Sequence, residues 1–124
     1  RPIPIWLGAG SSQTPVPPDS VLKRVARLAD GWCPNFNPDE SGRAILERTR
    51  GFMRELGRDP NSLSLDGRLR TSGKQPEDWL DEAKAWNELG ATYLSIENRQ
   101  SGLTTAGQHI EAMRRFKETV GFEI

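Results

Sequence analysis

Apolar and polar positions along this chain alternate between two patterns. Short apolar or alternating runs, typical of strands, are each followed by a longer stretch with apolar residues at helical spacing. The runs predict strands at 3–7, 31–34, 62–70 and 91–96. The helices are expected to follow them, from about Ser20, Asn37, Pro76 and Ala106, with Asn37 as the cap of the second. Four strand–helix units in a row predict an α/β fold with a parallel sheet.

The third strand separates two possible architectures. Its faces differ, with Leu63, Leu65 and Leu69 on one side and Ser64, Asp66, Arg68 and Arg70 on the other. A doubly wound sheet is covered by helices on both faces, so its strands carry apolar residues on both faces. One charged face therefore favours a stretch of a (β/α)₈ barrel, in which Arg68 and Arg70 lie near the carboxyl-end mouth and meet an anionic cofactor or substrate. An edge strand with a solvated face is the alternative.

Composition narrows the class of protein. The chain has 124 residues, which is one domain or a piece of a larger one, and Lys+Arg and Asp+Glu are equal at 17 each. The formal net charge at pH 7 is therefore zero, and the chain has no overall electrostatic attraction to nucleic acid or to an anionic membrane surface. The single Cys33 and the absence of an apolar run near ~20 residues predict a cytoplasmic protein without an internal disulfide. The start at Arg1, one step before a strand and without an initiator methionine, predicts that the chain is an internal part of a longer protein.

The turn after the first strand is the strongest candidate site. Gly8, Ala9, Gly10, Ser11 and Ser12 follow the apolar run directly. Glycines let the backbone approach an anion closely, and serines add hydroxyl donors to the N–H groups. This stretch is expected to bind the phosphate of a cofactor. A strand-to-helix turn that needs glycine only for its dihedral angles is the alternative.

Other single residues are less informative. Glu97 follows the fourth strand at the mouth, where it contacts substrate or, as the alternative, pairs with a nearby arginine. Tryptophans are expected in the core, and Trp32 is the one suited to a cofactor wall. No metal-ligand cluster, carboxylate pair or Ser-His-Asp set is visible. Hydrolytic and metal chemistry have no support, and no residue is assigned as a catalytic acid or base.

Four ordered segments carry a family resemblance. Residues 4–11 (PIWLGAGS), 27–32 (RLADGW), 56–60 (LGRDP) and 89–94 (LGATYL) resemble the carboxyl-terminal half of the luciferase-like flavin- and deazaflavin-dependent oxidoreductases. The resemblance covers nearly the whole chain. It implies a TIM (β/α)₈ barrel of more than twice this length. Residues 1–124 would form a single half-barrel region that holds its fifth to eighth strands, with the amino-terminal half absent.

The same resemblance implies chemistry. The cofactor would be FMN or 8-hydroxy-5-deazaflavin (coenzyme F-420), and the reaction hydride transfer or, in a monooxygenase, oxygen activation on the reduced ring. The loop from Gly8 to Ser12 would help to hold the cofactor phosphate, and the segment with Cys33 and Asn35 would lie near ring and substrate. The loop over 13–19 is longer and richer in proline than the family's usual connection.

The sequence also allows two other interpretations of function. A Rossmann-like nucleotide-binding domain could be built on Gly8 and Gly10, although Gln13 stands where its fingerprint needs a third glycine. The second alternative is a non-catalytic half-barrel scaffold that self-associates. Four parallel strands with helices on one side leave a face and two edges uncovered. The expected partners are therefore a cofactor, a small-molecule substrate, and a second copy or the missing barrel half.

Overall fold

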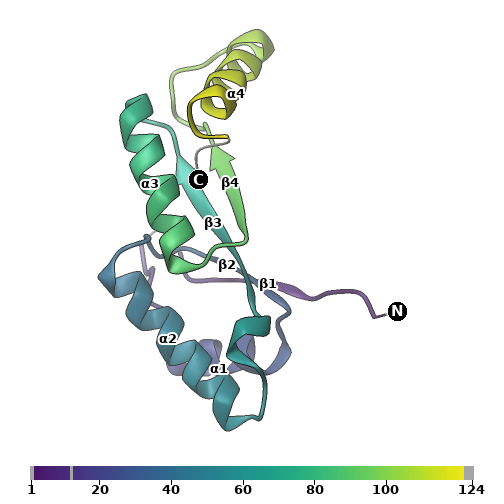
Figure 1. Ribbon diagram of the computed structural model, residues 1–124. Helices are drawn as coiled ribbons and strands as arrows, with labels where there is room; N and C mark the ends of the chain where they lie inside the picture. Colours follow the sequence, from purple (N-terminus) through teal and green to yellow (C-terminus); the bar gives the residue numbers. More distant parts are fainter. Residues whose placement is uncertain (1, 12, 122–124) are drawn as a thin grey trace.

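Four parallel strands form one sheet in the order β1-β2-β3-β4. The computed structural model describes residues 2–11 and 13–121 (Figure 1). The strands are β1 (Trp6–Ala9), β2 (Gly31–Pro34), β3 (Ser64–Arg70) and β4 (Tyr93–Glu97). Helices α1 (Asp19–Leu28), α2 (Glu40–Glu55), α3 (Pro76–Leu89) and α4 (Ala106–Val120) follow them, with a short 3₁₀ turn, η1 (Pro60–Ser62), before β3. The α/β class and the four strand–helix units are confirmed.

Pairing along the sheet is uneven. Strands β1 and β2 pair from Trp6↔Gly31 to Ala9↔Pro34, and β3 and β4 pair from Asp66↔Tyr93 to Arg70↔Glu97. Strands β2 and β3 are joined only at Gly31↔Ser64 and Trp32↔Leu65. The sheet is therefore made of two well-paired halves that meet through the amino-terminal part of β3.

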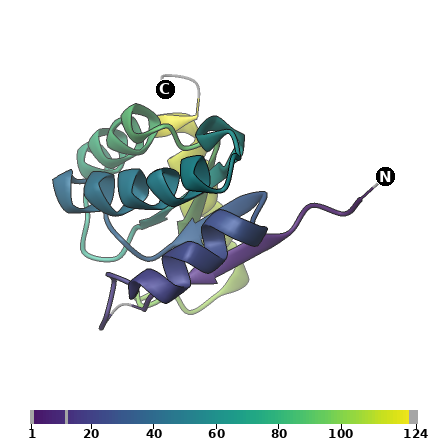
Figure 2. The same cartoon turned by 90° about the horizontal axis from the view of Figure 1, so that it is seen from below.

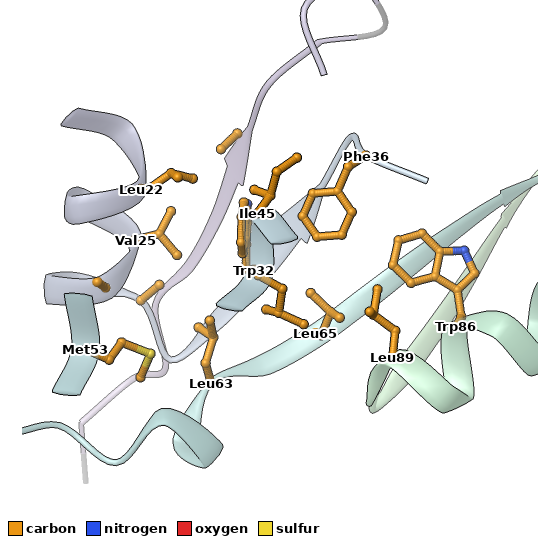
Figure 3. Close-up of a cluster of buried hydrophobic side chains, with 14 residues drawn as sticks. Leu22, Val25, Trp32, Phe36, Ile45, Met53, Leu63, Leu65, Trp86 and Leu89 are labelled. Carbon is orange, nitrogen blue, oxygen red and sulfur yellow. The ribbon is translucent and has the colours of Figure 1, made fainter. Parts of the chain in front are cut away.

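All four helices pack on the same face of the sheet. Leu22 of α1, Met53 of α2 and Leu89 of α3 join one buried cluster with Trp32 and Leu65 of the strands (Figure 3). Figure 2 shows α1 and α2 side by side on this face. A second cluster lies farther along the sheet and consists of Leu69, Trp79, Ala83, Phe116 and Val120. The predicted burial of the β3 leucines under the helices is confirmed.

Strand order and helix placement together limit the architecture. The order advances by one strand at each connection and never reverses. A doubly wound sheet reverses its order at a switch point and carries helices on both faces. The arrangement is compatible with half of a barrel. None of the helices in the described part of the chain is long and apolar enough to cross a membrane.

Some local expectations are wrong. The cap of α2 is Asp39, whose carboxylate accepts a hydrogen bond from the Gly42 N–H at 2.9 Å, and Asn37 lies two residues outside the cap. Ile110 and Met113 of α4 share helical spacing with the buried Phe116 and Val120, which predicts that they point inward, but they are 57% and 52% exposed. The physical reason is that α4 is the last helix, at the end of the layer. It therefore has a helix neighbour on one side only, α3.

Gly67 allows α3 to approach the sheet closely. It lies on the helix face of β3, where a Cβ would come within 2.5 Å of the Trp86 ring. A side chain there would displace a large buried ring, and overpacking of this kind typically costs about 1–3 kcal/mol. Gly51, inside α2, has no atom within 4 Å of the corresponding Cβ position.

We predict opposite effects of one methyl group at these two glycines. Gly67→Ala should lower the free energy of unfolding by about 1–3 kcal/mol. Gly51→Ala should raise it by about 0.5–1 kcal/mol, because alanine favours the helix interior. Urea unfolding followed by circular dichroism measures both. Equal changes in the two variants would contradict the packing of Trp86 on Gly67.

Candidate functional site on the inner face of the sheet

The candidate site is the sheet face that carries no helix. We call it the inner face, and its side chains alternate with those of the core. Its members are Trp6, Gly8, Gly31, Cys33, Ser64, Asp66, Arg68, Arg70, Tyr93, Ser95 and Glu97. The carboxyl ends of β3 and β4 place Arg68, Arg70 and Glu97 together at one edge of this face.

Asp66 is the centre of a polar network that joins three strands. The Ser95 hydroxyl of β4 donates to Asp66, with Oγ 3.0 Å from Oδ1 and 2.9 Å from Oδ2. The Cys33 thiol of β2 lies 3.8 Å from Asp66 Oδ2. These three residues, with Trp6, Tyr93 and Leu94, line an open hollow of about 390 Å³. Sequence alternation places Asp66 on this face, but its partners follow only from the strand register.

The chemistry of Cys33 is set by this neighbour. Burial raises the pKa of the Cys33 thiol, and the Asp66 carboxylate raises it further. Both effects disfavour the negatively charged thiolate. Cys33 is therefore a neutral thiol at pH 7, suited to lining a pocket rather than to nucleophilic attack.

The core prediction is confirmed for Trp32 and wrong for Trp6. Trp6 was expected in the core but lies 40% exposed on the inner face. A Cβ at Gly31 would come within 2.3 Å of the Trp6 ring, which packs edge-to-face on Tyr93 with ring centroids 5.5 Å apart. Trp32 is fully buried on the helix side, edge-to-face with Phe36, as predicted for a core tryptophan, so its alternative role as a cofactor wall is wrong. The aromatic surface of the site is therefore Trp6 and Tyr93.

Charges meet at the carboxyl edge of the inner face. Glu97 Oε1 accepts from Arg99 Nε at 2.7 Å, and Glu97 Oε2 lies 3.5 Å from Arg70 Nε. The hydrogen bond from Arg99 lowers the pKa of Glu97, and the charges of Arg99, Arg70 and Arg68 lower it further. Glu97 is thus ionised and held by arginines. This agrees with the alternative prediction for this residue, pairing with a nearby arginine. Arg68 has no ion-pair partner among residues 2–11 and 13–121.

Gly8 and Ala9 were predicted in the loop but are the last residues of β1, and the loop that follows them is tied to the segment after β2. The Asn35 side-chain amide donates to the backbone oxygens of Ala9 and Gly10, at 3.3 and 2.9 Å. Gly10 has φ +83°, a left-handed conformation, and a Cβ there would lie 3.1 Å from the Pro15 carbonyl oxygen. Glycine is required at this position for both reasons. Asn35 supports the loop through its NH₂ group and keeps its side-chain oxygen for other contacts.

The donors of this loop are partly occupied. The Ser11 N–H donates to the Thr14 backbone oxygen at 3.0 Å, and the two side-chain hydroxyls lie 2.8 Å apart. Ser12, also predicted to bind phosphate, lies outside the described residues. The prolines at 15, 17 and 18 have no N–H group, and Asp19 brings a carboxylate to the first turn of α1. The loop therefore offers fewer free anion-binding donors than its glycine and serine content indicates.

Comparison with known proteins gives no assignment. No family model matches the chain, and no curated protein matches it. The luciferase-like resemblance remains a prediction that rests on the four segments quoted above. The described part of the chain contains no group of three His, Cys, Asp or Glu residues placed to hold a metal ion.

We predict that Asp66→Asn accelerates alkylation of Cys33. Removing the carboxylate lowers the pKa of the thiol, so more thiolate is present at a given pH. Iodoacetamide labelling followed by mass spectrometry between about pH 7 and 9.5 measures the rate, over the range in which thiols ordinarily titrate. Asp81→Asn, on an exposed position of α3, is the matched control. A slower or unchanged rate in Asp66→Asn would contradict the network.

Glu97 gives a pH-dependent prediction. Because its folded-state pKa lies below the usual value of 4.5, Glu97 stabilises the fold above that pH, and this stabilisation is lost as the pH falls. Glu97→Gln removes the titrating group. The variant should therefore lose less unfolding free energy than the wild type between neutral and acidic pH, as measured by urea unfolding. A steeper loss in the variant would be inconsistent with the lowered pKa.

Proposed function

We propose that this chain forms the carboxyl-terminal half of a (β/α)₈ barrel and contributes to the cofactor pocket of a flavin- or deazaflavin-dependent oxidoreductase. The observation that supports this most is the one-sided sheet. Parallel sheets occur almost only with both faces covered. In a barrel, the strands of the remaining half cover the inner face, and the carboxyl ends form the mouth where barrel enzymes keep their sites.

The inner face fits an anionic, planar cofactor. Gly8 pairs with Cys33 in the register, and a Cβ at Gly8 would meet no atom within 4 Å, so Gly8 leaves room for a ring beside Cys33. Arg68, which has no ion pair within the described residues, and Arg70 supply positive charge at the carboxyl edge. FMN or the 8-hydroxy-5-deazaflavin coenzyme would supply the hydride-transfer or oxygen chemistry when bound.

Within this proposal the chain's residues have distinct tasks. The loop from Gly10 to Ser12 would hold the cofactor phosphate with the donors that the Ser11–Thr14 contacts leave free, while Asn35 keeps this loop against β2 through its bonds to Ala9 and Gly10. Arg68 and Arg70 orient the anionic part of cofactor or substrate, and Glu97 fixes the arginines around it. Neutral Cys33 lines the pocket. The balanced charge and single cysteine favour a small-molecule substrate in the cytoplasm over a nucleic acid or membrane partner.

Assembly is the second candidate function, and a specific observation favours it. Ile3, Trp6 and Tyr93 are all at least 40% exposed and line one hollow, and Trp6 and Tyr93 are in contact. Exposed apolar groups that cluster on an unpaired sheet face mark an interaction surface. The occupant is a second copy of the chain or the other half of the barrel. The unreversed strand order argues against the Rossmann-like alternative.

Titration with FMN and, in parallel, with the deazaflavin coenzyme tests the cofactor proposal. Arg68→Gln should weaken binding by about tenfold or more, because a charge-assisted hydrogen bond is lost. Lys84→Gln, on an exposed position of α3, is the matched control and should bind like the wild type. Quenching of flavin fluorescence gives the dissociation constants. Absence of saturable binding, or equal affinity in Arg68→Gln, would reject the proposal.

A further inference from the structure

A second cavity lies on the other side of the sheet, between the loops that lead into α3 and α4. We call it the α3–α4 cavity, and its volume is about 410 Å³. Its lining includes Lys74, Trp79, Ile96, Asn98, Met113 and Arg115. No inner-face side chain contributes to it. The cavity is therefore separate from the inner-face hollow.

The α3–α4 cavity combines an apolar wall with positive charge. Trp79, Ile96 and Met113 form the apolar part, and Lys74 and Arg115 bring two cations. No carboxylate lines the cavity. Lys74 is paired with Glu82, which lies outside the lining, whereas Arg115 has no ion-pair partner among the described residues. Arg115 is thus the cation available to a ligand.

A buried donor next to the cavity also lacks an acceptor. Trp79 is 7% exposed, and its indole N–H has no hydrogen-bond partner within the part of the chain that the structure describes. Buried polar groups in native proteins are nearly always paired, with protein, water or ligand. The indole N–H groups of Trp32 and Trp86, which do not line this cavity, also lack a partner among the described residues, so Trp79 contributes only to the apolar wall.

The groove between α1 and α2 is a weaker candidate for an anion. It is lined by Lys23, Arg24 and Arg27, but Glu55 lines it as well and opposes a negative ligand. Lys23 already lies over the Phe52 ring, with its Nζ atom 5.3 Å from the ring centroid. The α3–α4 cavity has neither obstacle.

We infer that the α3–α4 cavity binds a small organic anion, in which an oxyanion group is attached to an apolar body. Arg115 binds the oxyanion, since a guanidinium matches carboxylate and phosphate oxygens in geometry. Asn98 adds an amide donor, and Trp79 and Met113 pack against the apolar body. The volume lies within the range of small-molecule sites, roughly 300–1,000 Å³.

Three probes separate the two parts of this ligand class. Hexanoate carries both the oxyanion and the apolar body, acetate only the oxyanion, and 1-hexanol only the apolar body. The full chain should bind hexanoate saturably. Acetate should bind about tenfold more weakly or worse, because it lacks the methylenes that hexanoate buries. 1-Hexanol should bind more weakly by a similar factor, because it cannot form the charge-assisted hydrogen bond. Ligand-observed NMR titration measures all three.

Two neighbouring arginines of α4 provide a matched pair of variants. Arg115→Gln should weaken hexanoate binding by about tenfold or more. Arg114→Gln should leave it unchanged, because Arg114 pairs with Glu111 at 2.5 Å and does not line the cavity. Ala112→Phe, which fills the cavity from the same helix, should abolish binding while circular dichroism shows the fold intact.

The inference is overturned by any of three results. The first is no saturable hexanoate binding up to about 10 mM, a concentration that would reveal even a weak site. The second is equal loss in Arg114→Gln and Arg115→Gln. The third is 1-hexanol binding as tightly as hexanoate, which would show an apolar cavity without anion recognition. None of these results depends on FMN or deazaflavin binding at the inner face.

Discussion

All four helices cover one face of a parallel sheet and leave the other face bare, and this constraint determines the role of each strand residue. Each strand is followed by a helix, and all four helices return to the same face. Every second strand residue is therefore committed to the core, as Leu65 and Leu69 are in β3. The intervening residues face a surface that parallel sheets normally keep covered. What the chain does must follow from what occupies that surface.

The two faces are built from different kinds of contact. On the helix side, large rings and aliphatic side chains fill the layer, and Gly67 makes room for Trp86. On the inner face, Trp6 packs over Gly31 at the amino end, Asp66 joins three strands in the middle, and arginines surround a carboxylate at the carboxyl end. The inner face thus changes from apolar to charged along the strands. A ligand with an anionic part is directed to the carboxyl end.

Much of the fold could be predicted from the sequence, because periodicity reports local geometry. Alternation in β3 predicts which side chains are buried, and the helix starts at Pro76 and Ala106 agree with the structure. The exposure of Trp6 was missed because short apolar strands carry no alternation that indicates which side chains face the core. The Asp66–Ser95 contact joins residues 29 apart and requires the strand register. The hydrogen bonds that occupy Ser11 belong to a loop conformation that composition does not specify.

We propose that the uncovered inner face is the binding face. Cys33 is the only cysteine of the chain and lies on that face, so its alkylation reports directly on what covers it. The most direct measurement is the rate of iodoacetamide labelling of Cys33 with and without saturating FMN. This account predicts that FMN slows the labelling, because the ring lies over Gly8 and Cys33. Bound FMN with an unchanged labelling rate would place the cofactor elsewhere and contradict the account.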